Sequence, residues 1–496
     1  MEVRWPGERM PRRAFLAGGL GGLALALTAC TDGDPTPTPT PTHPPAPTPG
    51  AVPAPTAFRR SRWSSDPFVR GAFSFDGVGA TSDLRAALGE PVAGRLVITG
   101  EATSPDAPGT VHGAYAEGLR AAREIAAASE PGDRIAIIGA GIAGLAAARS
   151  LVDDGFEVVV VEAGDTVGGR LRTVDDAAFG GPIELGSPFA SADAALASAM
   201  TDAAVETTPY EPVSQVRDTT GRVVAPSSEG TDAIDGAVAW ARERGTDLSL
   251  TDALIGSGAI PAPGEPGADG LSPRDWLVHA IATGVEPAAG AVPGRVSAQR
   301  FEPGRAWPPD ERVTGGWTTL VDLLADGVRI AGSSVVTGIS IDDEGVGMRL
   351  DTGESLRMHR VVVTASIGVL KTDTITFDPP LPLRHQRAIG VLGMGALDLA
   401  WLAFDEPFWR TAGGAHAADG TSGAEPDVFT LVGATPTVAA WLDLGEGPER
   451  AVLVGVIAAQ HARRIAELDD ADALAELLEA LAPFATGASA TPPSED

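Results

Sequence analysis

One stretch of the chain limits its fold more narrowly than any other. Residues 134–138 form a short apolar run of the kind found in buried parallel strands. This run leads directly into Gly139-Ala-Gly141-Ile-Ala-Gly144, which opens the helical pattern of residues 145–152. A second β-branched run, residues 156–161, is followed by Glu162. Strand, glycine turn, helix, strand and acidic residue in this order predict a dinucleotide-binding βαβ unit.

Each residue of this motif has a physical role. Gly139 allows a tight turn, Gly141 lets the backbone approach a pyrophosphate, and Gly144 lets helix and strand pack closely. The helix N-terminus offers unpaired N–H groups and partial positive charge to the phosphates. Glu162 can accept hydrogen bonds from both ribose hydroxyls and would repel a 2′-phosphate, which disfavours NADP. The alternative is a glycine-rich turn with a purely structural role.

Composition excludes several classes of protein. Hydrophobic residues make up 44% of the 496 residues, enough for a core, and the length suggests about two or three domains. The net charge of −30 argues against a nucleic-acid partner. A single cysteine, Cys30, excludes internal disulfides, cysteine-rich zinc sites and iron–sulfur clusters. The histidines show no metal-ligand spacing, so no metal site is predicted.

Residues 1–30 have the features of an export signal. Arg12-Arg13 precede an apolar stretch of about 16 residues that ends at Cys30, which is short for a membrane span of ~20 residues. The paired arginines resemble a twin-arginine signal, and Leu27-Thr-Ala-Cys30 resembles a bacterial lipobox, whose cysteine is lipidated after cleavage. The alternative is a chance cysteine in an ordinary signal.

A Thr/Pro-rich linker follows at residues 31–56. Proline removes backbone donors and fixes φ, so this stretch should be an extended, semi-rigid spacer. It would hold a folded body, beginning near Phe58, away from a membrane. We therefore expect an exported lipoprotein that is anchored in the cell membrane through Cys30 and faces outside. Twin-arginine export suits a protein that takes up its cofactor in the cytoplasm.

Further motifs lie on both sides of the βαβ unit. Downstream are Gly168-Gly169-Arg170-Leu-Arg172 and Glu184-Leu-Gly186-Ser187. Upstream are Trp63 to Ser74, Gly94 to Thr103, and Gly109-Thr-Val-His-Gly-Ala-Tyr115. Together they resemble the flavin-containing amine oxidase family, which includes monoamine oxidases, polyamine oxidases, histone lysine demethylases and L-amino-acid oxidases. The resemblance covers roughly residues 57–496, is weak between 190 and 309, and implies FAD rather than NAD.

The order of the segments departs from that of the family. Residues 57–128 resemble the family's C-terminal segment, yet here they precede the glycine motif. The other family motifs follow in their usual order, at residues 314–317 opening a helix, 335–336 ending a strand, 361–371, 377–382 and 404–409. We interpret this as a circular permutation joined at residues 129–132, the alternative being a chance arrangement of gene fragments. A permutation predicts that strands 95–99 and 134–138 share one sheet.

The resemblance implies an α/β fold with two domains, circularly permuted. A Rossmann-like FAD-binding domain of the GR2 type would comprise residues 57–188 with 311–365. An α+β substrate domain would comprise residues 189–310 with 366–496, with Asp275-Trp276-Leu277 on one of its helices.

The resemblance also implies roles for individual residues. Glu101 would bind a hydroxyl of the ribityl chain, the turn at 109–113 would direct helix-start amides at N1 and O2 of the flavin, and Val336 would meet adenine through its backbone. His112 is expected to be a structural or flavin-edge residue rather than a base. Three rings would border the substrate, with core packing as their alternative: Trp63, Phe68 and Phe73. The predicted cofactor-binding residues are Gly139, Gly141, Ala143, Gly144, Glu162, Ala163, Gly169, Arg170, Gly186, Ser187, Val336, Gly100, Glu101, Thr110 and Val111.

One position departs from the family pattern. Many members place a lysine near flavin N5, where it holds a water and assists the reaction with oxygen. Leu399 occupies that position, and the only lysine, Lys371, belongs to another motif, so no catalytic residue is assigned. We expect FAD-dependent oxidation of an amine or amino acid to an imine, with oxygen as acceptor. The alternatives are an FAD dehydrogenase or desaturase with another acceptor, and a non-catalytic surface protein that binds FAD.

Overall fold

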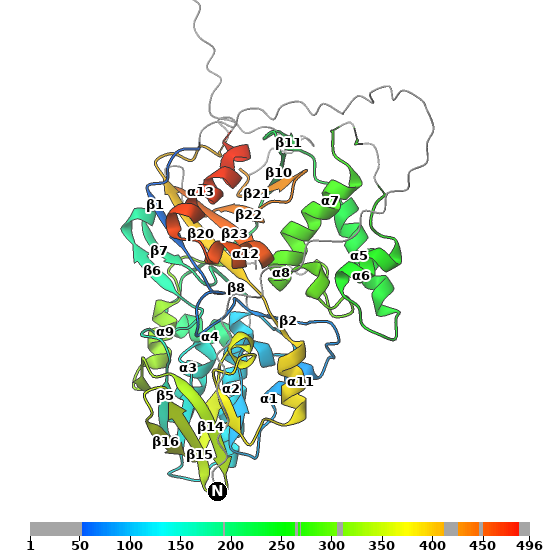
Figure 1. Ribbon diagram of the computed structural model, residues 1–496. Helices are drawn as coiled ribbons and strands as arrows, with labels where there is room; N and C mark the ends of the chain where they lie inside the picture. Colours follow the sequence, from blue (N-terminus) through cyan, green and yellow to red (C-terminus); the bar gives the residue numbers. More distant parts are fainter. Residues whose placement is uncertain are drawn as a thin grey trace, which may run out of the picture. The chain divides into compact units, whose positions relative to one another are not determined.

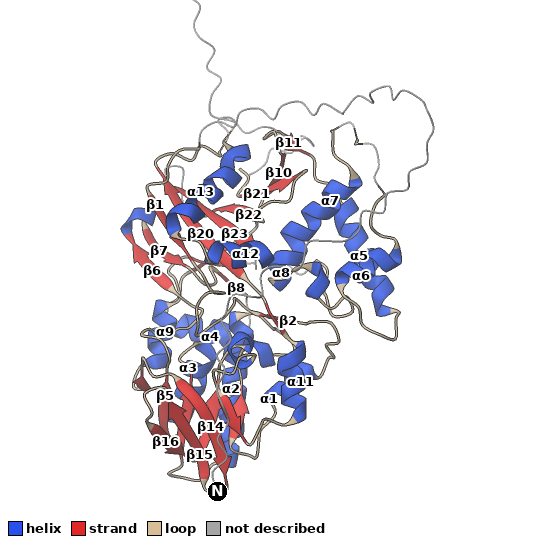
Figure 2. Cartoon of the chain, viewed as in Figure 1, coloured by secondary structure: helices blue, strands red, loops and turns tan. Residues whose placement is uncertain are grey.

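The computed structural model describes residues 52–191, 194–262, 266–267, 269–304, 311–410, 425–445 and 450–485. The predicted signal with Cys30 and most of the predicted linker lie outside the described residues. Among the helices that are described, none has both the length and the apolar composition needed to cross a membrane. The arrangement of the elements along the chain is shown in Figure 1, and Figure 2 separates helices from strands.

A five-stranded parallel sheet forms the part of the fold that contains the glycine motif. Its order is β13 (Arg329–Ala331), β5 (Glu157–Val161), β4 (Arg134–Ile138), β17 (Arg360–Val363) and β3 (Leu96–Ile98). Every neighbouring pair is parallel. Both faces of the central strands are buried, which explains their continuous Ile and Val content. The expectation that the strands near 95–99 and 134–138 share a sheet is confirmed, with β17 lying between them.

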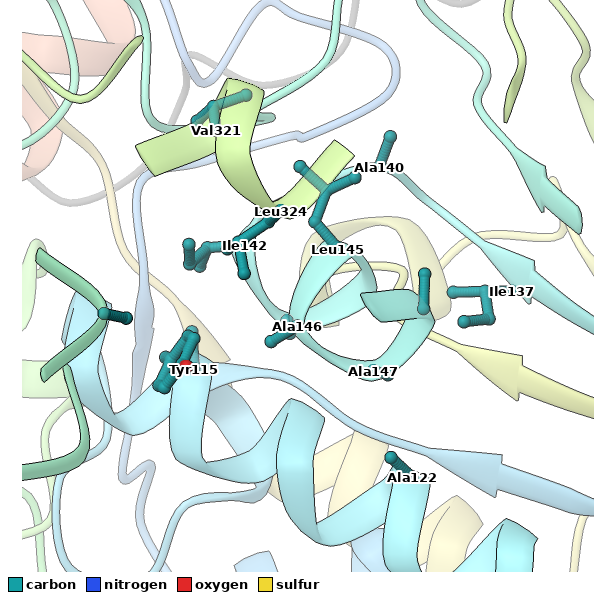
Figure 3. Close-up of a cluster of buried hydrophobic side chains, with 14 of the residues drawn as sticks. Tyr115, Ala122, Ile137, Ala140, Ile142, Leu145, Ala146, Ala147, Val321 and Leu324 are labelled. Carbon is teal, nitrogen blue, oxygen red and sulfur yellow. The ribbon is translucent and has the colours of Figure 1, made fainter. Parts of the chain in front are cut away.

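Two helices cover this sheet and approach each other closely. Helix α2 (Val111–Ala128) packs on α3 (Ile142–Asp153), and a Cβ added to Gly118 of α2 would lie 2.2 Å from the carbonyl oxygen of Ala143. Small residues on both helices permit this contact, because larger side chains would hold the backbones apart. Figure 3 shows α3 surrounded by the buried side chains of this core, including Val321 and Leu324 of α9 (Thr318–Ala325).

A four-stranded sheet follows in the chain, in the order β16 (Ser355–Met358), β15 (Gly345–Leu350), β14 (Val336–Asp342) and β18 (Thr376–Asp378). Residues 335–336 were expected to end a strand, and this is wrong, since Val336 begins β14. The short apolar run at this point fits the end of a strand as well as its beginning. The pairing of β14 with β15 shows that the strand begins here. Near this sheet lie α1 (Leu84–Gly89), α10 (Ile367–Leu370) and α11 (Leu383–Val391).

The largest sheet has seven strands, in the order β1 (Ala57–Arg60), β20 (Leu397–Phe404), β23 (Ala451–Ala458), β22 (Ala440–Asp443), β21 (Val428–Val432), β10 (Ser214–Asp218) and β11 (Val223–Val224). Every residue of β20 and β23 is buried. Strand β1 begins at the boundary predicted for the FAD-binding domain, and it pairs with β20 rather than with a strand of the parallel sheet. Short-range pattern could not show a partner more than 300 residues away.

A helical part lies between β11 and β12 in the chain. It contains α5 (Glu229–Arg242), α6 (Leu250–Ser257), α7 (Pro273–Ala280), the π-helical turn at Ile281–Val285, and α8 (Glu286–Ala289). Ser272 and Asp275 form a capping box that starts α7. The remaining elements are β2 (Ser74–Phe75), β6 (Thr173–Asp176), β7 (Gly181–Glu184), β8 (Phe189–Ala190), α4 (Ala194–Asp202), β9 (Thr207–Pro209), β12 (Glu311–Val313), β19 (Gly393–Met394), α12 (Ala459–Ala466) and α13 (Asp470–Leu481).

Candidate active site

A cavity of about 730 Å³ lies at the carboxyl ends of the parallel strands. Both Glu101 and Glu162 line it, although Glu101 precedes the glycine motif in the chain and Glu162 follows it. Leu399 of β20 lines the same cavity. The space is therefore shared by the βαβ unit, the upstream segment and the seven-stranded sheet.

The glycine turn after β4 forms one end of this cavity. Gly139 has φ +103°, and a Cβ there would lie 2.3 Å from Thr364 Oγ1. A Cβ on Gly144 would lie 2.0 Å from the carbonyl oxygen of Gly139. Gly144 is the only predicted cofactor-binding residue that does not line the cavity, so its role is to let α3 approach β4. Because no side chain fills this turn, a pyrophosphate can reach the α3 N-terminus, and the residues present fit FAD.

Glu162 ends β5 beside this turn. One carboxylate oxygen accepts the N–H of Ala140 at 2.6 Å, and the other accepts the N–H of Gly164 at 2.7 Å. These bonds hold the carboxylate in place at the cavity edge. Each carboxylate oxygen has a second lone pair, so both can still accept a ribose hydroxyl.

Glu101 is more fully engaged by the protein than the sequence suggested. Its carboxylate accepts Ser74 Oγ at 2.6 Å, the Gly109 N–H at 3.0 Å and Arg170 Nη1 at 3.0 Å. Burial would raise the pKa of Glu101, but Arg170, Ser74 and Arg85 together lower it below its ordinary value. Glu101 therefore stays ionised and ties three segments together at the cavity wall. A ribityl hydroxyl would share its oxygens with these donors.

The N-terminus of α2 also borders the cavity. Thr110 is the N-cap, since its Oγ1 accepts the N–H of Gly113 at 3.0 Å. Thr110, Val111 and His112 all line the cavity. The helix N-terminus thus directs its partial positive charge into this space, and its contact with the flavin N1–O2 edge stays a prediction.

Aromatic side chains gather at another part of the cavity. Trp63, Phe68 and Phe73 line it, as predicted. Trp63 is 5% exposed and donates from Nε1 to the carbonyl oxygen of Leu185, whereas Phe68 is 43% exposed. The guanidinium of Arg172 lies 5.5 Å from the centroid of the Trp63 ring. Sequence analysis missed other rings that line the cavity, namely Phe75, Phe189 and Phe301.

Strand β20 contributes an apolar part of the cavity wall. Leu399 is 2% exposed, and Leu397 of the same strand face also lines the cavity. Lys371 donates to the carbonyl oxygen of Gly390 and is not among the lining residues. No lysine ammonium therefore reaches the described part of this cavity.

The helical part contributes side chains that sequence analysis did not find. Arg300 and Glu302 line the cavity, with Arg300 Nε 3.7 Å from Asp76 Oδ2. They lie in the stretch with the weakest motif resemblance, so no local signal identified them.

Glu184 of β7 is 2% exposed. Its carboxylate accepts hydrogen bonds from Thr173 Oγ1 and from the backbone N–H groups of Arg172 and Gly186. Burial raises the pKa of Glu184 to about 7.

The geometry can be compared with known proteins. The profile of the family described as flavin-containing amine oxidoreductases matches residues 46–126, 142–247 and 279–495. The chain belongs to this family. A polyamine oxidase 4 of Oryza sativa subsp. japonica is 26% identical over 378 residues, covering 68% of this chain and 70% of the relative. A putative flavin-containing monoamine oxidase of Mycobacterium tuberculosis is 31% identical over 317 residues, covering 56% of this chain and 66% of the relative.

Solved structures support the same fold. Wild-type putrescine oxidase bound to putrescine matches with a TM-score of 0.52 and 22% identity, covering 71% of this chain and 81% of that one. The fold is thus mixed α/β, similar to that of putrescine oxidase. Family and cofactor predictions agree, and the chain is an FAD-dependent oxidoreductase that acts on amines. Within the described residues, no group of three or more His, Cys, Asp or Glu side chains is arranged to hold a metal ion.

Proposed function

We propose that this protein oxidises an amine or amino acid to an imine inside this cavity, with oxygen as acceptor. The observation that carries this proposal is the continuity of the cavity from the glycine turn and Glu162 to Trp63, Phe73 and Leu399. FAD would supply the two-electron chemistry, taking a hydride from the carbon beside nitrogen. The imine is then hydrolysed by water.

The chain's own residues bind and orient in this scheme. The 139–141 turn and the α3 N-terminus would hold the pyrophosphate, and Glu162 the ribose. Glu101 keeps Arg170 and the 109–111 turn in place through its hydrogen bonds. The rings of Trp63 and Phe73 provide flat apolar surfaces in the cavity.

An absorbance spectrum of the purified protein, followed by turnover assays, tests this proposal. We expect a bound flavin spectrum that bleaches when an oxidisable amine is added without oxygen, and peroxide formation in air. A protein without flavin, or a flavin that no amine or amino acid reduces, would contradict the proposal. The second result would leave a non-catalytic FAD-binding role.

A second candidate passes the electrons to an acceptor other than oxygen. The observation that favours it is Leu399, which places a buried methyl-bearing side chain where a lysine would hold a water. Leucine cannot donate a hydrogen bond, so the water site is lost or displaced. Reduction of a dye by substrate, without peroxide in air, would favour this dehydrogenase.

Arg172 bears on the class of substrate. Its guanidinium borders the cavity beside Trp63, and its charge lowers the pKa of buried Glu184 against the larger raising effect of burial. A positive charge there repels the ammonium of a plain amine but attracts a carboxylate. We therefore place amino acids ahead of diamines such as putrescine. Higher kcat/KM for amino acids in the wild type, lost in Arg172→Met, would support this order; a preference for putrescine in both would reject it.

We also propose that the chain is a circular permutation of the family fold and is exported as a lipoprotein. The permutation is supported by two strands of the segment 57–128, because β3 pairs with β17 and β1 pairs with β20. It is also supported by the short link at 129–133, which joins α2 to β4. A gene in which residues 57–128 follow residue 485 should still yield a folded flavoprotein, and insoluble product without flavin would count against it. Labelled fatty acid should attach to wild-type Cys30 and not to Cys30→Ala.

A further inference from the structure

The carboxylate of Asp398 lies directly behind the cavity wall and has no part in the chemistry proposed above. It stands on β20 between Leu397 and Leu399, the two residues of this strand that line the cavity. Because side chains alternate along a strand, Asp398 projects away from both leucines. It is 2% exposed. Burying this carboxylate costs desolvation free energy, which its interactions with the protein must offset.

Two donors meet on one oxygen of this carboxylate. Oδ1 accepts the backbone N–H of Trp63 at 2.9 Å and the hydroxyl of Ser61 at 2.9 Å. Ser61 Oγ in turn accepts the N–H of Leu399 at 2.9 Å, and the Ser61 N–H donates to the Leu399 carbonyl oxygen at 3.0 Å. Oδ2 is buried and has no hydrogen-bond partner in the described part of the chain.

These bonds hold the start of a loop that forms much of the aromatic wall. The carbonyl oxygen of Trp63 accepts the N–H of Gly71 at 2.9 Å, which closes the loop 63–71. Pro67, Phe68 and Val69 of this loop line the cavity together with the Trp63 ring. The hydrogen bond from the Trp63 N–H to Asp398 Oδ1 thus holds the backbone where the loop begins, while Ser366 Oγ donates to the carbonyl oxygen of Val69 at 2.6 Å further along it.

We propose that Asp398 is a positioning residue that fixes the loop 63–71, and with it the Trp63 face of the substrate pocket, and that its ionisation sets how firmly the loop is held. The naming of this pocket as the substrate site rests on the proposed function. The anchoring of the loop does not. An ionised carboxylate accepts hydrogen bonds more strongly than its protonated form, so ionisation tightens the hold on Trp63.

The charges around Asp398 leave its ionisation finely balanced. Burial raises the pKa of Asp398 to about 6, against the opposing effects of Trp63, Ser61, Arg60 and Arg62. Arg60 is committed elsewhere, pairing with Asp470 and donating to two carbonyl oxygens. Arg463 of α12 also interacts with this carboxylate through its charge. Its guanidinium donates a hydrogen bond to the carbonyl oxygen of Met394. A group with this pKa changes charge within the pH range of ordinary assays.

Hydrogen–deuterium exchange on the flavin-loaded protein tests the anchoring without any need for turnover. Asp398→Ala removes both acceptor bonds and should speed exchange in the peptide covering residues 61–71 by about tenfold or more, given the usual strength of a charge-assisted bond. Asp472→Asn, a carboxylate change at an exposed residue of α13 that is not part of the Arg60–Asp470 pair, is the matched control and should leave this peptide unchanged. Unchanged exchange in Asp398→Ala would overturn the proposal.

Kinetics test the link to the pocket. With the best substrate, Asp398→Ala should raise KM about fivefold or more with little change in kcat, since the loss corresponds to one charge-assisted hydrogen bond. In the wild type, kcat/KM should rise through a limb near pH 6, and Asp398→Asn should lack that limb. Wild-type KM and an unchanged pH profile in both variants would reject the pocket role. If the wild type oxidises no amine, the proposed function fails, while the exchange result still decides the anchoring.

Discussion

The close approach of α2 and α3 makes Gly118→Ala an informative substitution. The added methyl group would lie 2.2 Å from the carbonyl oxygen of Ala143 and 3.0 Å from its carbonyl carbon. Both are backbone atoms of α3, so they cannot move aside as a side-chain end could. The helices must therefore separate by roughly 1 Å to restore van der Waals contact distance.

The cost follows from two opposing contributions. Overpacking of this kind costs about 1–3 kcal/mol, whereas alanine is about 1 kcal/mol better than glycine inside a helix. The net expectation is a loss of about 0–2 kcal/mol in the free energy of unfolding, against a gain where the added methyl group is free. FAD affinity should fall too, because Ala143 and the α2 N-terminus both line the cavity. Denaturant titration and FAD release measure the two effects.

A matched control lies on another helix. Gly236 sits in α5 with no heavy atom within 4 Å of an added Cβ, so Gly236→Ala should gain up to about 1 kcal/mol and leave FAD binding unchanged. If Gly118→Ala stabilises the protein as much as Gly236→Ala and keeps full FAD affinity, the tight helix contact is not required. Destabilisation by both variants would instead show that the gain from the higher helix propensity of alanine over glycine was overestimated.

Three further predictions concern the site. Leu399→Lys should speed reoxidation by oxygen relative to Leu397→Lys, its neighbour on the same wall, as stopped-flow absorbance would show; equal rates would argue against a special role for position 399. Glu162→Ala should weaken FAD binding, measured by flavin fluorescence on dilution, since two amides lose their acceptor along with the ribose. Burial raises the pKa of Glu184 to about 7, so the folded state favours its protonated form and the free energy of unfolding should fall as pH rises from about 5 to 7. This fall should reach about 3 kcal/mol and be flatter in Glu184→Gln; parallel curves would refute it.

Local sequence was sufficient for the cofactor end of the site. The strand, glycine turn, helix and Glu162 lie within one short stretch, and each meets its partners inside the same βαβ unit. The short motifs around Glu101, Gly169 and Thr110 likewise place their residues on the cavity. Such positions are predictable because backbone conformation and nearest neighbours are decided over a few residues.

Other features were decided only when distant segments met. β1 joins β20, Asp398 receives Ser61 and Trp63, and Arg300 reaches the cavity from the helical part. None of these contacts carries a local signal, because an aspartate in an apolar strand has no visible partner until the chain folds. Sequence by itself determined the dinucleotide unit, the cofactor class and the family. Tertiary structure decided which further side chains join the cavity wall and what holds them there, because hydrogen bonds and packing form between residues that are neighbours only in space.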